Sequence, residues 1–391
     1  MDRINYETVC GITLNRIFGY EPAAARTLIS RFGSPGAVFS QDSDTLDAVF
    51  GPYSRHRDSI NERELEISAR ELEMLEQSGA RFVLYGEPGY PPLLAECPDA
   101  PVGIYLRSMS PPEKLFEKRD CISVVGTRDI SPYGKEWTEK IVGEISRSPS
   151  RPLIISGFAI GVDITAHLAA MAFGLPTVAV LPVGIDDIYP QRHRTVAEKL
   201  LGTPGCALIS DFPPGTGPVP FNFLRRNRII AGASRATVLI ESKAKGGGTM
   251  TARLAAGYGR ELFCLPGRID DNRSAGCNLL IQEKLAESLI SSSVIVAQLG
   301  LANPSKGVPE LETMIRSCYG RSNPDTLGKL TEIALFIKRH RGSTIEEICR
   351  ALCFSYGETA AFVNLLESDG FVSVDLLQRC SIDNKKAYLC T

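Results

Sequence analysis

Short apolar, β-branched segments recur through the middle third of the chain, and each is bounded by Gly, Pro, Ser or Asp. Segments with apolar residues at helical spacing separate them. Strands that are apolar throughout and alternate with helices are typical of a parallel sheet covered by helices on both faces. We therefore predict an α/β fold with strands at residues 122–125, 153–155, 178–181, 207–209, 238–240 and 262–265, and helices at 135–147, 162–173, 192–201 and 250–258.

The two ends of the chain show a different, mainly helical pattern. Near the N-terminus, Leu14, Ile17, Leu28, Ile29 and Phe32 recur near helical spacing. Beyond a polar linker near residues 303–323, the pattern predicts helices at 330–340, 345–352 and 359–369, followed by strands at 371–374 and 386–389. We therefore divide the chain into a helical domain (1–75), an α/β domain (82–300) and a C-terminal domain (325–391).

Composition and charge restrict the partners. The 391 residues are 43% hydrophobic and 23% charged, as in an ordinary globular protein, and the net charge is −2. A site for a polyanion must therefore be a local cluster of Arg and Lys. No segment has the roughly 20 apolar residues of a membrane helix, and the start lacks a secretory signal, so we expect a cytoplasmic protein without a membrane partner. The eleven cysteines are scattered without a C-x-x-C pair, and we predict neither a metal nor a cofactor.

Three predicted strands end in glycine-rich loops that open helices. They contain Gly126-Thr127-Arg128, Ser156-Gly157 with Gly161, and Lys245 to Thr249. Glycine lets backbone N–H groups approach an anion, and a helix N-terminus adds unpaired donors and a positive dipole. A tight turn needs glycine for conformational reasons alone, so one such loop is weak evidence. Three loops on one edge of a sheet favour a phosphate site.

A fourth segment adds arginines and aromatic residues. Residues 221–232 contain Phe221, Phe223 and three arginines within four positions. Arginine suits phosphate oxygens, and an exposed phenylalanine offers a face for base stacking. The alternative is that both phenylalanines lie in the core and the arginines form a solvated helix face. The predicted phosphate contacts are Gly126, Thr127, Arg128, Ser156, Gly157, Gly161, Arg225, Arg226, Asn227, Arg228, Lys245, Gly246, Gly247, Gly248, Thr249 and Thr251, and Phe221 and Phe223 are the predicted stacking residues.

These motifs together resemble the DNA-processing protein A family (DprA, also called Smf), bacterial proteins of natural transformation. The resemblance runs from about residue 82 to 300. It rests on residues 125–128 with 131–134, 156–157 with 161–163, 179–182 with 188–190, 210–215, 226–232, 251–253, 265–267 and 276–281.

The resemblance implies an extended Rossmann-like domain that binds and protects single-stranded DNA, forms a homodimer and loads the RecA recombinase. It also implies that Arg128 contacts phosphate, along with Lys245, Thr249, Arg226 and Arg228. The flanking domains resemble a sterile-alpha-motif or helix-hairpin-helix domain and a winged helix. One departure is Ile160, which stands where the family usually has Arg, and another is the triple glycine 246–248, where the family has S-G-S.

Two enzyme classes share parts of this pattern. A nucleotide phosphoribohydrolase also has a glycine-rich turn after a strand, but it requires a carboxylate just after the Gly-Thr pair. Here Met250-Thr251-Ala252-Arg253 follows. A dinucleotide-dependent oxidoreductase requires G-x-G-x-x-G after its first strand, where Gly126 stands alone. We therefore predict a protein that binds DNA without catalysis, and keep the phosphoribohydrolase-like enzyme as the alternative.

Overall fold

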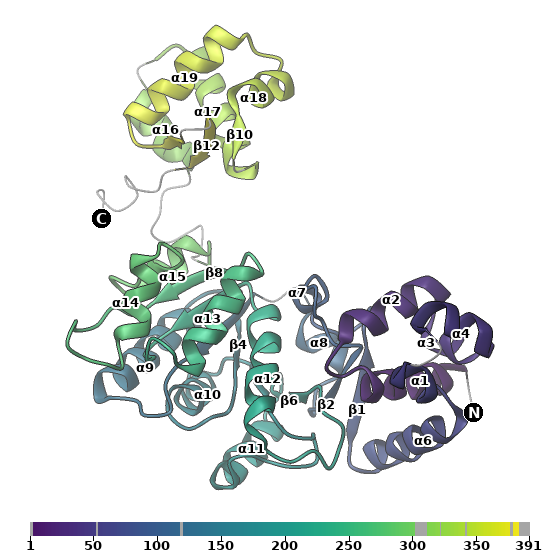
Figure 1. Cartoon of the computed structure of the whole chain (residues 1–391). Helices are drawn as coiled ribbons and strands as arrows, with labels where there is room; N and C mark the ends of the chain where they lie inside the picture. Colours follow the sequence, from purple (N-terminus) through teal and green to yellow (C-terminus); the bar gives the residue numbers. More distant parts are fainter. Residues whose placement is uncertain are drawn as a thin grey trace. The chain divides into compact units, whose positions relative to one another are not determined.

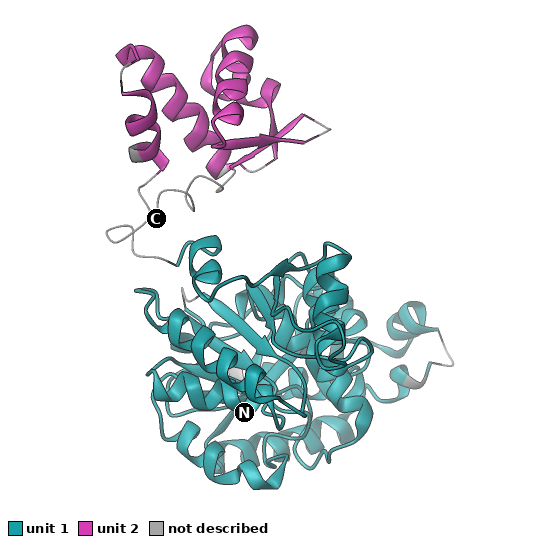
Figure 2. Cartoon of the chain, turned by 90° about the vertical axis from the view of Figure 1, so that its left-hand side faces the viewer, with its two compact units in different colours: residues 1–301 teal, residues 302–391 magenta. Residues whose placement is uncertain are grey.

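The computed structural model describes residues 3–51, 54–117, 120–301, 311–320, 322–340, 342–375 and 378–382. The chain forms two compact units, residues 1–301 and 302–391 (Figure 2). Every helix among the described residues is too short or too polar to cross a lipid bilayer.

A nine-stranded sheet organises the described part of the first unit (Figure 1). Its order is β1-β2-β6-β5-β4-β3-β7-β8-β9. Neighbouring strands from β6 to β9 pair in parallel, whereas β1 pairs with β2, and β2 with β6, in antiparallel fashion. The strands are β1 (Ala80–Leu84), β2 (Gly103–Arg107), β3 (Cys121–Val125), β4 (Leu153–Ser156), β5 (Thr177–Val180), β6 (Ala207–Ser210), β7 (Ala236–Leu239), β8 (Glu261–Cys264) and β9 (Glu287–Ser288).

The predicted α/β class is confirmed, since the molecule is a mixed α/β protein with a large, mostly parallel sheet. All six predicted strands form, as β3 to β8, with ends shifted by one or two residues. Strands β1, β2 and β9 were not among the predicted strands.

Helices cover both faces of the sheet. One face packs Ile122, Val124 and Val238 against α9, α10 and α15. The other packs Val180, Ile209 and Leu239 against α7, α12, α13 and α14. The helices are α7 (Pro92–Ala95), α8 (Pro112–Leu115), α9 (Pro132–Ser146), α10 (Val162–Ala172), η1 (Gln191–His193), α11 (Arg194–Leu201), α12 (Pro220–Gly232), α13 (Gly247–Gly257), α14 (Ala275–Gln282) and α15 (Ser293–Gln298).

The N-terminal helices share a core with the antiparallel end of this sheet. Leu14, Leu28 and Leu75 lie in one apolar cluster with Phe82 and Tyr105 of β1 and β2. The separate helical domain over residues 1–75 stays a prediction. The helices are α1 (Arg3–Ile17), α2 (Pro22–Phe32), α3 (Pro35–Phe39), α4 (Ser43–Phe50), α5 (Arg55–Asp58) and α6 (Glu62–Gln77).

The second unit has its own core, in which Ile333, Ile348, Val363 and Leu366 are fully buried. Three helices lie where the sequence predicts them, but α16 forms within the segment predicted as a polar linker, and a small sheet has the order β10-β12-β11. The strand predicted at residues 386–389 lies outside the described residues. The elements are α16 (Leu311–Tyr319), α17 (Pro324–Arg339), β10 (Ser343–Thr344), α18 (Ile345–Leu352), α19 (Tyr356–Ser368), β11 (Val372–Val374) and β12 (Arg379–Ile382).

Candidate functional site

The sheet has a topological switch point between β3 and β7. From β3 the chain adds β4, β5 and β6 on one side, then crosses back to add β7, β8 and β9 on the other. The loops after β3 and β7 therefore turn away from each other, and such a crevice is where ligands bind in open α/β sheets. A cavity of about 490 Å³ lies at this point.

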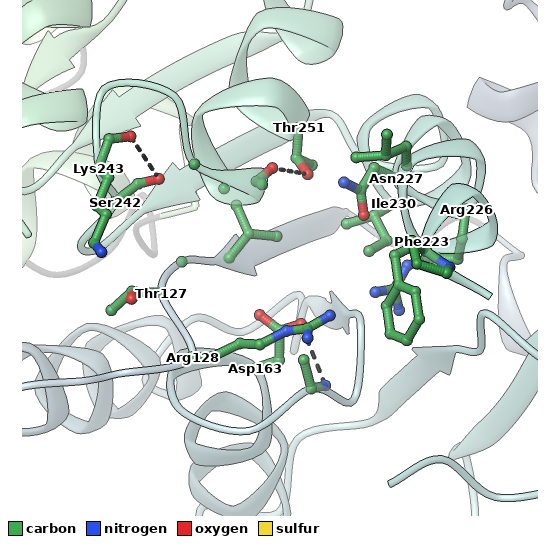
Figure 3. A pocket seen from close by; sticks show the side chains of 18 of the residues that line it. Thr127, Arg128, Asp163, Phe223, Arg226, Asn227, Ile230, Ser242, Lys243 and Thr251 are labelled. Atoms are coloured by element: carbon green, nitrogen blue, oxygen red, sulfur yellow. Dashed lines mark hydrogen bonds between the residues drawn. The ribbon is translucent and has the colours of Figure 1, made fainter. Parts of the chain in front are cut away.

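The cavity brings together three of the four segments chosen from the sequence. Figure 3 shows Thr127 across the cavity from Thr251 and Asn227, with the Arg128 side chain extending toward Phe223. Of the predicted residues, its lining includes Gly126, Thr127, Arg128, Phe223, Arg226, Asn227, Gly246, Gly247, Gly248 and Thr251.

The loop after β7 is held in a fixed shape by side chains. The Ser242 hydroxyl accepts hydrogen bonds from the Thr249 amide at 3.1 Å and the Thr249 hydroxyl at 2.9 Å. The Gly246 amide donates to the Lys243 carbonyl at 2.9 Å, which closes a turn before α13. The amides of Gly247 and Gly248 have no hydrogen-bond partner among the described residues. The first turn of α13 thus presents free donors and a positive helix end at the cavity.

The loop after β3 is anchored on its neighbours through Thr127. Its amide donates to the Glu241 carbonyl at 2.6 Å, and its carbonyl accepts from the Val162 amide at 3.1 Å. Gly161 has a φ of 88° and packs against the Thr127 carbonyl, a position that excludes a β-carbon. This anchoring fixes the point from which Arg128 extends over the cavity.

Arg128 is an exposed cation without an ion-pair partner among the described residues, and its charge acts on the Asp163 carboxylate only at longer range. No hydrogen bond or ion pair joins its side chain to another described residue, and its guanidinium carbon lies 4.7 Å from the centre of the Phe223 ring. The edge of Phe223 in turn contacts Tyr189, with ring centres 5.4 Å apart. Arg128 therefore rests on the ring that was predicted to stack a base.

Arg226, by contrast, is used inside the protein. It is buried, and it donates to the carbonyls of Gly157 and Val180 at the ends of β4 and β5. Burial lowers the pKa of Arg226 to about 10, although the nearby Asp163 carboxylate opposes this. Burial also raises the pKa of Asp163, an effect that Arg226 opposes. A β-carbon at Gly157 would lie 2.5 Å from the Arg226 guanidinium, so this glycine makes room for an arginine.

Arg225 and Arg228 converge on a buried acid. Their guanidinium groups lie 2.8 Å and 2.6 Å from the same oxygen of Asp211, whose side chain is fully buried. Arg228 also donates to the carbonyl of Asp99. Neither arginine belongs to the cavity lining. The arginines of α12 are therefore not a solvated face, and two of them point away from the cavity.

The other predicted residues lie outside the main cavity. Ser156 is buried and donates to the Val124 carbonyl at 2.6 Å, and Thr249 donates to the Lys243 carbonyl at 2.8 Å. Lys245 is exposed beyond the lining. Phe221 is 58% exposed and its ring lies 5.7 Å from Tyr20. A pocket of about 30 Å³ beside the cavity includes Gly157, together with Arg128, Ala159, Ile160, Pro182, Tyr189, Pro190 and Phe223.

Two charged lining residues were not predicted as ligand contacts. Lys243 is an exposed cation without an ion pair among the described residues, two positions before Lys245. Asp163 is 7% exposed and its carboxylate accepts from the Ala159 amide at 3.4 Å, which braces the start of α10. The turn that the Gly246 amide closes places Lys243 in the lining of the cavity, and Lys245 lies outside it.

Comparison with known proteins identifies relatives of this unit. Residues 81–300 match the model of the DNA recombination-mediator protein A family. The chain is 34% identical over 229 residues to protein Smf of Synechocystis sp., covering 59% of this chain and 56% of that protein. It is 37% identical over 194 residues to the DNA processing protein DprA of Streptococcus pneumoniae, covering 50% of this chain and 66% of that protein. The alignment with the first of these thus spans little more than half of its length.

A solved structure agrees with these matches. The X-ray structure of DNA processing protein A from S. pneumoniae superposes with a TM-score of 0.62 at 28% identity, covering 76% of this chain and 99% of that one. The sheet and its flanking helices are therefore shared with a structurally characterised relative.

Proposed function

Because the chain belongs to the DNA recombination-mediator protein A family, we propose that it binds single-stranded DNA, without catalysis, at the cavity between β3 and β7. The main support for this proposal is that hydrogen-bond donors without partners converge at this cavity. Arg128 and Lys243 form no ion pair among the described residues, and the amides of Gly247 and Gly248 that open α13 have no hydrogen-bond partner there. Such donors suit phosphate oxygens, and their salt-sensitive attraction to a polyanion is independent of sequence.

We assign separate roles to the residues of the cavity. Gly126 to Arg128, Lys243 and Gly246 to Gly248 hold the phosphodiester backbone, and Asn227 and Thr251 supply polar contacts from the facing wall. Phe223 stacks a base once Arg128 has moved from its ring to a phosphate. Ser156, Gly161, Arg225, Arg226, Arg228 and Thr249 support this arrangement through their contacts within the protein.

The cellular role follows from the relatives. Relatives of this chain carry the name DNA processing protein DprA. On this basis we propose that the chain acts in natural transformation and recombination in the cytoplasm. Protection of incoming single strands, loading of RecA and homodimerisation belong to the same proposal. The helices of residues 1–75 and the second unit, with its helices and small sheet, are proposed as sterile-alpha-motif-like and winged-helix-like interaction domains.

The alternative, a phosphoribohydrolase-like enzyme, is less favoured by the cavity. A hydrolase needs a carboxylate on the helix that follows the glycine-rich turn. The first turns of α13 carry Met250, Thr251 and Arg253, and the carboxylate of the cavity, Asp163, comes from α10, where it holds the Ala159 amide. Incubation with nucleoside monophosphates tests this alternative, and release of free base would favour it.

Binding to labelled oligonucleotides tests the main proposal. We expect single-stranded DNA to bind more tightly than a duplex of the same sequence. Arg128→Ala should weaken binding about tenfold or more at low salt, since a hydrogen bond to a charged group is worth about 1.5–3 kcal/mol. It should also flatten the plot of log affinity against log salt by about 0.7.

The matched control is Arg147→Ala, which removes an exposed arginine that pairs with Glu144 on α9. This control should bind like the unmodified protein. Equal binding by the Arg128 and Arg147 variants would refute the proposed site, and absence of single-strand binding in the unmodified protein would refute the function.

A further inference from the structure

Two exposed aromatic rings form a pair beside the cavity. Tyr20, in the turn after α1, is 65% exposed, and Phe221, in the first turn of α12, is 58% exposed. Their ring centres lie 5.7 Å apart with 42° between the planes. Val219 and Leu224 beside them are 49% and 42% exposed. An exposed apolar cluster of this kind marks a contact surface.

The pair is rigidly mounted. The guanidinium carbon of Arg225 lies 4.6 Å from the centre of the Tyr20 ring and 4.6 Å from that of Phe212. Its position between the rings is fixed by the ion pair with Asp211 at 2.8 Å. A β-carbon at Gly19 would lie 3.0 Å from the same guanidinium and 2.9 Å from the Asn15 carbonyl, so the turn requires glycine to approach this closely.

The N-terminal segment is tied to the same acid. The Asn15 side chain of α1 donates to the Asp211 carbonyl at 3.0 Å. The guanidinium of Arg225 beneath the ring therefore holds Tyr20 over α12. The carboxylate of Glu21, the next residue in the chain, is directed to His56, with 3.5 Å between Oε2 and Nε2.

Phe221 of this pair lies next to cavity-lining residues in the chain, at the start of α12. Pro218, Pro220 and Leu224 line the cavity, and Phe221 and Val219 alternate with them in the chain. The N-terminus of α12 (Pro220–Gly232) adds the positive end of its helix dipole at this rim of the cavity. A strand that passes over Pro220 thus meets the exposed rings next.

We propose that Tyr20 and Phe221 form a stacking platform for bases of the single strand that leaves the cavity. The inference rests on the proposed function and extends it to the N-terminal segment, which supplies one of the two rings. Stacking on aromatic faces tolerates any sequence, as a protein that follows a strand by its phosphates requires. A protein partner fits less well, because a standard protein interface uses about 20–30 residues a side and this cluster offers four large side chains.

Binding of oligothymidylates of increasing length to the full chain tests the platform. Tyr20→Ala should leave the affinity for the shortest binding oligonucleotides unchanged, because these fill only the cavity. For longer ones it should weaken binding about fivefold or more, the loss expected for one stacked base. Tyr20→Phe keeps the ring and should bind like the unmodified protein. Tyr356→Ala removes a tyrosine of the second unit that is also 58% exposed and serves as the control.

Abasic sites identify the stacked base. In the unmodified protein, an abasic site at one position beyond the cavity should reproduce the loss caused by Tyr20→Ala, and the variant should then be insensitive to that site. Undiminished binding of every length by Tyr20→Ala would overturn the platform, and so would a loss that no abasic position reproduces. Loss of the dimer in Tyr20→Ala without a change in DNA affinity would instead assign the pair to a contact between copies. When Arg128→Ala is measured with the shortest binding oligonucleotides, which fill only the cavity, the two proposals fail separately.

Discussion

Helix α12 and the two glycine-rich loops carry similar sequence signals but use their cations in opposite ways. In α12, Arg225 and Arg228 share the buried carboxylate of Asp211, and Arg226 binds two carbonyl oxygens. In the loops, Arg128 and Lys243 are exposed and form no ion pair among the described residues. A cluster of arginines thus indicates a phosphate site only where the fold provides no internal acceptors for them.

The reason for the difference is the cost of burying charge. A buried guanidinium must be paired and hydrogen-bonded, so each arginine that α12 turns inward needs an acid or carbonyl oxygens close by. The loops lie at the edge of the sheet, where water solvates Arg128 and Lys243 until an anion replaces it. Changes in α12 should therefore act mainly on stability, and changes in the loops mainly on binding.

The largest expected effect is that of Asp211→Asn. The change leaves Arg225 and Arg228 without a counter-charge in a buried site, which should lower the free energy of unfolding by about 3–5 kcal/mol. Urea unfolding followed by the fluorescence of Trp137, the only tryptophan of the chain, reports on the first unit. The control Asp270→Asn breaks the exposed pair with Arg268 and should leave the midpoint unchanged. An unchanged midpoint for Asp211→Asn would mean that α12 does not depend on this carboxylate.

Most of the sheet was predictable because its strands carry a strong local signal. The segments that became β3 to β8 are apolar throughout, and only a parallel sheet with both faces covered buries such strands. Strand β2 escaped prediction because one of its two partners, β6, lies about a hundred residues away in the chain. Its antiparallel place between β1 and β6 is set by these neighbours and not by its own pattern.

The glycine-rich loops were predictable as site elements, whereas the direction of the arginines was not. Gly126 to Arg128 and Gly246 to Gly248 meet at the switch point because strand order alone brings them together. The direction of Arg228 depends on Asp211, seventeen positions away, and the place of Tyr20 depends on a turn that only the tertiary fold sets against α12. Partners this remote leave no local pattern in the sequence.

A second, smaller effect on stability comes from His167, which the buried charge of Arg226 helps to keep neutral. His167 is buried, and its Nδ1 lies 2.7 Å from the Thr177 hydroxyl. Burial, with the charge of Arg226 as the next cause, lowers the pKa of His167 to about 3. The unfolded chain takes up this proton below about pH 6.5 while the folded protein does not, so stability falls as the pH decreases.

As the pH falls from 7 to 5, this histidine should lower the free energy of unfolding by roughly 2 kcal/mol. His167→Asn removes the titrating group and should reduce the pH dependence of the urea midpoint by that amount, again read from Trp137. The same change at the exposed His340 of the second unit is the control and should leave the pH dependence of the first unit intact. If His167→Asn keeps the full dependence on pH, His167 is not the group that takes up the proton.

The smallest effect separates two lysines of one loop. Lys243 lines the cavity and Lys245 does not, because the Gly246 amide closes a turn on the Lys243 carbonyl. A long, exposed lysine contributes a point charge, so Lys243→Ala should weaken single-strand binding only about threefold at moderate salt and flatten the log–log salt plot by about 0.7. Lys245→Ala, equal in charge and two positions away, should leave both quantities unchanged.

Equal losses in the two variants would mean that the strand contacts the whole loop from outside, and a loss confined to Lys245→Ala would reverse the assignment. A loss confined to Lys243→Ala would show that the turn, and not the charge of the segment, selects the cation that meets phosphate.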